Sequence, residues 1–197
     1  TGGGSRTPLE RVPISVRRPY SPDMSTATRP GRPWSRAELE TAFQHYQDEV
    51  DRIAGSGDWS RFADLFTEDA TYREHAYGDF SGREEIRHWI VETMTTFPGS
   101  EMPRFPIEWH VVDEERGRIV CEVWNDLVDP GDGERHGASN ITILTYAGDG
   151  LWSCEEDVYN PATFLRATRR WAKVAGRHDR LSDEGRSWLA AFGPTGG

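Results

Sequence analysis

The chain has 197 residues, a formal net charge of −10 and a sequence pI of about 5.1. This length suits one domain with tails, and the acidic charge argues against nucleic acid as a partner, since no locally basic face is visible from the sequence after residue 36. No run of about 18 apolar residues predicts a membrane span and no signal-peptide pattern opens the chain, so we expect no membrane partner and a cytoplasmic location.

Residues 1–33 form a separate compositional regime. They hold six prolines and six arginines and few large apolar residues, so they cannot bury enough surface to offset the entropy of ordering. We expect a disordered leader. Met24, followed by small polar residues, is typical of a native start, which would make residues 1–23 added or upstream sequence. A natural basic arm is the alternative.

The first ordered element is expected at Ser35, because Ser35 and Glu38 have the spacing of a capping box. The helix that follows ends at the glycines 55–57. Asp58 is then expected to cap a second helix. A β-prone strand through Thr71 leads to a tight loop, and a third helix covers 83–96. Apolar residues mark one face of the first helix: Leu39, Ala42, Phe43, Tyr46, Val50 and Ile53.

Four β-like runs follow in meander spacing, at 105–112, 118–128, 138–147 and 151–159. Short turns rich in Gly and Asp separate them, so neighbouring strands must pair antiparallel. A helix begins with Pro161 at its first turn, and the tail 177–197 carries a short helix at 182–191. The order predicts an α+β domain over 34–176, with helices gathered on one face of a curved antiparallel sheet.

Several segments match a known family in chain order: Tyr46-x-x-x-Val50-Asp51, Gly57-Asp58-Trp59, Leu65-Phe66-Thr67-Glu68-Asp69-Ala70-Thr71, Gly82-Arg83-Glu84-Glu85-Ile86 and Gly148-Asp149-Gly150-Leu151-Trp152. Over about residues 36–175 the chain resembles the nuclear transport factor 2-like superfamily, within it the SnoaL-like polyketide cyclase and ketosteroid isomerase-like group. The resemblance implies a cystatin-like cone, a bent sheet wrapped around the helices with an apolar pocket inside. It is specific for fold and weak for activity.

The resemblance also implies roles for individual residues. In ketosteroid isomerases a carboxylate at the end of the first strand is a general base, and this position falls on Glu74. A tyrosine of the first helix, which stabilises an enolate oxygen, falls on Tyr46. The partner acid falls on Thr142, whose hydroxyl is a poorer oxyanion donor than a protonated carboxyl and argues against steroid isomerisation itself.

The residues themselves leave the site open at two points. His75 is the alternative base, or orients Glu74, since imidazole titrates near neutrality. Strand alternation sends Glu74 and His75 to opposite sides, unless the turn at Gly78 twists the strand end. The alternative for Glu74 is a surface position paired with Arg73 or Arg83.

The last expected strand offers a second polar group, because Glu155, Asp157 and Tyr159 share one face of it by alternation. If that face is inward, Asp157 is placed to bind a water or a His75 imidazolium. If it is outward, the acids serve solubility.

Aromatic residues are more numerous than a compact core requires, with eight Trp, eight Phe and six Tyr. We expect several to line a cavity for a flat, hydrophobic ligand. The alternative is plain packing plus a dimer face, and the surplus in the sheet predicts a homodimer through its outer face. The candidate ligand contacts are Tyr72, Trp124, Asn140, Thr142, Tyr159 and Trp59.

No pattern predicts a metal or a cofactor. The six histidines show neither two-His helical spacing nor a Cys-His cluster, and no Gly-x-Ser-x-Gly elbow or phosphate-binding glycine loop occurs. Two lone cysteines, Cys121 and Cys154, are more typical of a reducing compartment than of a disulfide framework.

Two hypotheses follow. In the first, the protein is a cofactor-free lyase, isomerase or cyclase. Glu74 or His75 takes a proton alpha to a carbonyl, while Tyr46, with Asp157 or Asn140, polarises the oxygen. In the second, it is a non-catalytic module that binds a hydrophobic small molecule or simply dimerises.

Overall fold

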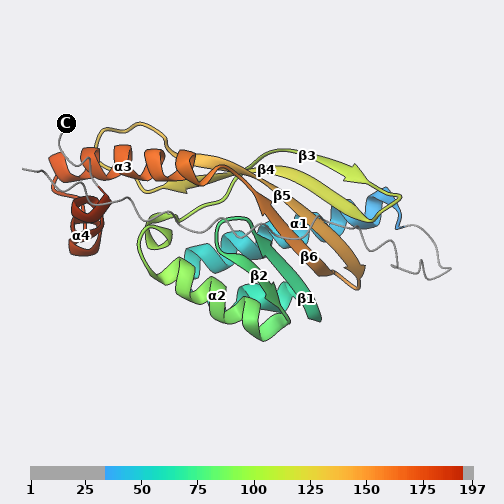
Figure 1. Cartoon of the computed structure of the whole chain (residues 1–197). Coiled ribbons are helices and arrows are strands. Elements are labelled where there is room, and N and C mark those ends of the chain that lie inside the picture. The colour runs from blue at the N-terminus through green and yellow to red at the C-terminus, as the bar shows by residue number, and fades with distance from the viewer. Residues whose placement is uncertain (1–33, 193–197) are drawn as a thin grey trace, which may run out of the picture. The chain divides into compact units, whose positions relative to one another are not determined.

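A computed structural model describes residues 34–192 (Figure 1). The expected leader, residues 1–33 with Met24, lies outside the described residues, as do residues 193–197.

Helix α1, Arg36–Ser56, begins and ends where the sequence predicts. The Ser35 hydroxyl oxygen accepts a hydrogen bond from the backbone N–H of Glu38 at 3.2 Å, which confirms the predicted cap. The helix ends at Gly57, whose φ of 73° is the left-handed conformation that favours glycine. Its predicted apolar face is buried, and this face carries Tyr46 into the interior.

The segment after α1 differs from the prediction. It is a short 3-10 helix, η1, Trp59–Leu65, and the Asp58 side chain makes no capping hydrogen bond. Trp59, Phe62 and Leu65 are nevertheless buried. Hydrophobic spacing of three to four residues fits both helix types over so short a stretch, so the pattern did not separate them.

Six strands form one sheet in the order β2-β1-β6-β5-β4-β3. The predicted meander is confirmed, since β3 to β6 pair antiparallel with their chain neighbours. Strand β1 lies parallel to β6, and β2 forms a hairpin with β1 where the sequence pattern predicts only a loop. The strands are β1 Phe66–Glu74, β2 Gly78–Ser81, β3 Ile107–Asp113, β4 Arg118–Leu127, β5 His136–Gly148 and β6 Leu151–Val158.

Helices α1 and α2, Arg83–Thr95, pack with the inner face of the sheet to form the main core (Figure 1). Strand residues such as Leu144 and Trp152 meet helix residues such as Phe43 and Ile86 there, all fully buried. The predicted α+β class is therefore confirmed.

A second, smaller core lies around Trp171 of α3, Pro161–Arg177. The Trp171 ring N–H donates to the carbonyl of Val128 at 2.6 Å, which ties α3 to the chain after β4. Helix α4, Asp183–Phe192, follows in the predicted tail, and its Trp188 packs against this core. Within residues 34–192, no helix has the length and apolar character needed to span a membrane.

Candidate active site

A cavity of about 760 Å³ lies between the inner face of the sheet and the helices. Residues of α1, η1 and α2 line one side of the cavity, and inner-face residues of β1, β4, β5 and β6 line another. Residues of α3 and α4, near the end of the sequence, complete the wall. This volume lies within the range of pockets that hold small organic ligands. Most of the wall is apolar, and the polar side chains gather where β1, β6 and β5 lie next to one another.

Strand register brings these polar side chains together. Glu74 of β1 pairs with Asp157 of β6, and Asp157 pairs in turn with Thr142 of β5. Two residues earlier, Tyr72 of β1 pairs with Glu155 of β6. Residues two apart on a strand share a face. Two rows of side chains from three adjacent strands therefore point to the same side of the sheet, the side that the cavity occupies.

Asp157 is the acceptor at the centre of the group. Its Oδ1 accepts from the Thr142 hydroxyl at 2.5 Å and from the Asn140 side-chain amide at 2.7 Å, and its Oδ2 accepts from the Tyr72 hydroxyl at 2.5 Å. Burial raises the pKa of Asp157 to about 6, although the donors from Thr142 and Tyr72 act in the opposite direction.

Glu155 lies deeper, with 3% of its surface exposed. The Tyr46 hydroxyl donates to its Oε2 at 2.9 Å, and the Tyr72 hydroxyl lies 3.1 Å from its Oε1. Burial and the neighbouring Asp157 raise the pKa of Glu155 well above its usual range. Burial and the same carboxyls raise the pKa of both tyrosines, so these hydroxyls keep their protons.

Glu74 ends β1 and is 5% exposed. Its Oε2 accepts from the backbone N–H groups of Ala76 and Tyr77, both at 2.7 Å, in the turn between β1 and β2. Burial and a hydrogen bond with Glu74 raise the pKa of Tyr159. The turn thus fixes one oxygen of the Glu74 side chain with two backbone donors.

Aromatic rings form much of the remaining wall. Trp89 of α2 lies against Tyr72, with ring centroids 4.5 Å apart, and against Phe80 at 4.8 Å. Trp59 meets Phe105 edge to face at 5.6 Å. All five residues line the cavity, so a ligand beside the carboxyls also contacts ring faces and edges.

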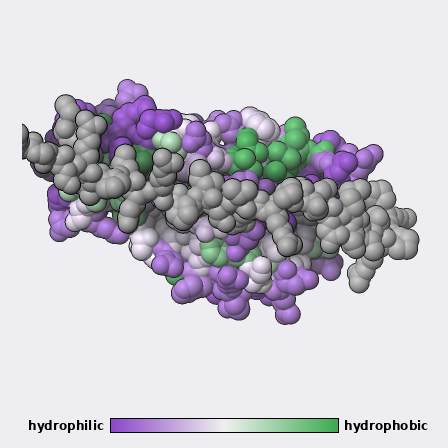
Figure 2. Space-filling model, in the orientation of Figure 1, coloured by the Kyte–Doolittle hydropathy of each residue, from purple (hydrophilic) through white to green (hydrophobic). Residues whose placement is uncertain are grey.

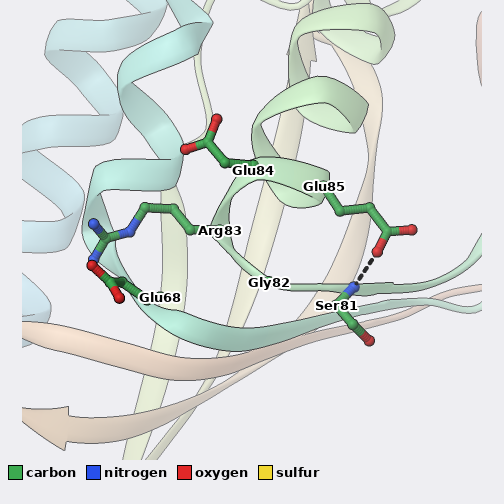
Figure 3. Close-up of a pocket in the computed structure, with 6 residues that line it drawn as sticks. All are labelled: Glu68, Ser81, Gly82, Arg83, Glu84 and Glu85. Atoms are coloured by element: carbon green, nitrogen blue, oxygen red, sulfur yellow. Dashed lines mark hydrogen bonds between the residues drawn. The ribbon is translucent and has the colours of Figure 1, made fainter.

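A second depression lies at the beginning of α2, away from these residues (Figure 3). The Arg83 side chain donates to the carbonyl of Phe66, and Glu85 accepts from the backbone N–H of Ser81 at 2.9 Å. These contacts fasten β1 and the end of β2 to α2. Arg83 is therefore engaged here and does not pair with Glu74.

Eight of the ten residues expected at the site line the cavity: Glu74, Tyr46, Asp157, Tyr72, Asn140, Thr142, Tyr159 and Trp59. The inward orientation of Glu155, Asp157 and Tyr159 resolves the alternative that the sequence left open for the last strand.

Two expected residues are not in the cavity wall. His75 is exposed, and its Nε2 lies 2.9 Å from the Glu156 carboxylate on the opposite side of the strands. Trp124 lies between Val123 and Asn125, which do line the cavity, so alternation turns it outward. There the Arg135 guanidinium lies over its ring, 4.7 Å from the centroid.

The residue that the sequence reasoning left out of the site is Glu155. Its signal was available, because alternation already grouped it with Asp157. The contribution of α4 was also missed: Trp188 and Phe192 line the cavity. No sequence pattern tells how a short helix in a tail docks.

The described part of the chain contains no metal-binding group of side chains and no reactive cysteine pair. No three His, Cys, Asp or Glu side chains among residues 34–192 are arranged to hold a metal ion. Cys121 and Cys154 are free thiols, and burial raises the pKa of both, which disfavours the reactive thiolate.

Comparison with known proteins gives a family. The sequence profile of the SnoaL-like domain matches residues 43–154, more than half of the chain. No curated relative matches.

Solved structures are similar in fold. An uncharacterised protein from Catenulispora acidiphila with a ketosteroid isomerase-like fold, crystallised with trimethylamine, is 19% identical over 68% of this chain and 93% of its own, with a TM-score of 0.50. A candidate polyketide cyclase from Sinorhizobium meliloti is 15% identical over 64% and 100%, at 0.45. A Methylobium petroleophilum protein of unknown function with a cystatin-like fold is 18% identical over 65% and 79%, at 0.47.

Proposed function

The chain belongs to the SnoaL-like domain family, and from that premise we propose that its cavity is the active site of a cofactor-free lyase, isomerase or cyclase. The substrate is a hydrophobic carbonyl compound, and the chemistry is general acid-base catalysis. The observation that carries the proposal is that Glu74, held by backbone donors, lines the same largely apolar cavity as Tyr46 and Glu155.

Glu74 is the proposed base. Two backbone donors hold its Oε2 in the turn after β1, so the carboxylate is oriented before the substrate arrives. It takes a proton from the carbon alpha to the carbonyl, which leaves a neutral Glu74 and an enolate. The enolate then regains the proton at another carbon, expels a leaving group, or attacks a second carbonyl. These three outcomes correspond to an isomerase, a lyase and a cyclase.

The enolate oxygen needs proton donors, and the hydrogen bonds of the cluster decide which remain. Thr142, Asn140 and Tyr72 all donate to Asp157, so Asp157 acts as their acceptor and does not polarise a carbonyl. Tyr46 and Glu155 are the other two candidates: burial raises the pKa of both, and the Tyr46 hydroxyl, which contacts Glu155 in the free protein, would turn to the enolate oxygen. Buried neutral donors aimed at developing charge are an effective form of transition-state stabilisation.

The alternative function is a non-catalytic pocket for a hydrophobic ligand. It is favoured by Thr142, which has no carboxyl and whose hydroxyl is engaged by Asp157. The two functions differ in whether bound carbonyl compounds exchange their alpha protons.

The test measures that exchange. With 2-tetralone in D₂O followed by NMR, we expect the wild type to accelerate alpha-deuteration and Glu74→Gln to lose roughly a thousandfold of the acceleration. The glutamine oxygen can still accept from the Ala76 and Tyr77 N–H groups, so thermal stability is expected to stay nearly unchanged. The matched control is Glu156→Gln, an acid outside the cavity wall. Full exchange by Glu74→Gln would show that the base lies elsewhere.

A homodimer through the outer face of the sheet is also proposed. Trp109 and Val111 of β3 and Val158 of β6 are exposed there, and Figure 2 shows a green hydrophobic patch over the region of β3 and β4. Apolar surface of this kind favours association. Light scattering of the full chain at micromolar concentration is expected to give twice the chain mass and to fall toward the monomer mass for Val111→Lys. A monomer mass for the wild type would remove the proposal.

A further inference from the structure

The cavity wall contains acidic residues but no basic ones among the described residues. Its carboxyl-bearing residues are Asp51, Glu74, Glu92, Glu155 and Asp157, whereas none of the described residues that line it is a lysine, arginine or histidine. The rest of the wall is mainly aromatic and aliphatic. An apolar, ring-lined cavity indicates an organic ligand independently of the acids, and the acids then specify its charge.

Hydrogen counting gives the charge of the polar end. The Tyr72 hydroxyl has one hydrogen but lies within hydrogen-bond distance of both Asp157 and Glu155. It can donate to only one of them, at 2.5 Å to Asp157 or 3.1 Å to Glu155, so the second contact requires a proton on one of the two carboxyls. The two carboxyls therefore share one proton and carry one negative charge between them, and the three donors around Asp157 favour the charge there. A further carboxyl group, that of Glu74, occupies the position directly paired with Asp157.

The basic side chains next to Glu74 in the sequence and at the start of α2 do not compensate this charge. Arg73 and His75, the β1 neighbours of Glu74, both lie against Glu156 outside the cavity, with atoms 4.0 and 2.9 Å from its carboxylate. Arg83 donates to the carbonyl of Phe66. Two buried carboxylates without a counter-cation repel each other and lose hydration, which is unfavourable in a low-dielectric site.

We infer that the ligand of this cavity supplies the missing cation: it is a hydrophobic compound with a protonated tertiary amine or a quaternary ammonium group. The charged nitrogen lies between Asp157 and Glu74, and the hydrocarbon body lies among the rings beside them, including Tyr72 and Trp89. Aromatic faces attract such cations as well as covering their alkyl groups. The inference deepens the proposed function and rests on it only for the choice of cavity.

The test compares two probes of the same shape. Benzyltrimethylammonium carries one positive charge, and neopentylbenzene has a carbon atom in place of the nitrogen. Binding to the full chain is followed by tryptophan fluorescence, since Trp59, Trp89 and Trp188 line the cavity. We expect the cation to bind at least tenfold more tightly. Equal or tighter binding of the neutral probe, or no binding of either, overturns the inference.

Variants of single acids test which carboxyls cause the preference for the cationic probe. Asp157→Asn is expected to reduce the ratio of the two affinities at least tenfold, and Glu74→Gln to reduce it as well if Asp157→Asn does not fold. Glu156→Gln removes an acid from the same strand outside the cavity and is expected to leave the ratio unchanged. A ratio that survives in both cavity variants overturns the inference. Because binding needs no turnover, the cation preference and the exchange of 2-tetralone fail or succeed separately.

Discussion

Strand β6 presents the same chemistry to two different environments. Glu155 and Asp157 point into the cavity, and Glu156 between them points to the opposite face. On the outside, Glu156 meets His75 and Arg73 and remains partly exposed. On the inside, the two carboxyls meet only hydroxyl and amide donors.

The difference shows that the partners, and not the residue type, decide what a carboxyl can do. Basic partners and water surround the outer acid, which is the usual environment of a surface carboxyl. Neutral donors compensate only part of the lost hydration, so burial raises the pKa of both inner carboxyls. The raised pKa of Asp157, about 6, lies closer to physiological pH than that of a surface Asp, as acid-base chemistry requires.

The largest expected effect that tests this contrast is on the pH dependence of stability. The pKa of Asp157 rises from 3.8 to about 6 on folding, so between these values the folded protein binds a proton that the unfolded chain has released. The resulting stabilisation is fully present below about pH 4 and is lost as the pH rises through about 6. It amounts to at most about 3 kcal/mol.

Urea denaturation of the wild type and Asp157→Asn at pH 4 and pH 7.5 measures this loss. The free energy of unfolding of the wild type, relative to that of the variant, is expected to fall by about 2–3 kcal/mol between the two pH values. The same comparison with Glu156→Gln is expected to show little change, since that carboxyl is partly exposed. A relative stability that rises with pH would contradict the burial argument.

The sequence predicts best the elements that have a long stretch of regularly spaced apolar residues and a clear end. Helix α1 has a cap at Ser35, six apolar residues on one face and a glycine stop at Gly57, and all three are found. The meander is predicted because strands joined by short turns can pair only antiparallel. Strand β2 is not predicted, because its four residues, Gly78–Ser81, are too few to show an alternation of apolar and polar side chains.

Predicting the site requires the register between strands that are distant in the sequence. Alternation groups Glu155 with Asp157 and separates Glu74 from His75, but it does not say which group faces inward. Family comparison along the chain puts the missing acid at Thr142, whereas the register puts Asp157 directly beside Thr142 on the next strand. A carboxyl group therefore lies next to Thr142, but it accepts the Thr142 hydroxyl proton and does not take the place of the missing donor. The turn at Gly78 leaves the alternation intact, which is why His75 faces away from the cavity.

The smaller expected effect concerns Tyr72, the hydroxyl that joins the two inner carboxyls. Tyr72→Phe keeps the ring against Trp89 and removes only the oxygen, so the loss reports the hydrogen bonds. At pH 7.5 Asp157 is ionised, and a lost hydrogen bond to a charged group is expected to lower the free energy of unfolding by about 2 kcal/mol. At pH 4 the acceptor is neutral and the loss is expected to fall to about 1 kcal/mol.

The matched control for Tyr72→Phe is Tyr77→Phe, which removes the same atom from a residue that is 72% exposed. Its effect on stability is expected to stay within about 0.5 kcal/mol at both pH values. An equal loss in the two variants, or a Tyr72→Phe loss that does not depend on pH, would mean that the hydroxyl does not donate to an ionised Asp157. The two carboxyls would then be independent buried acids, and the assignment of the proton to Glu155 would lose its basis.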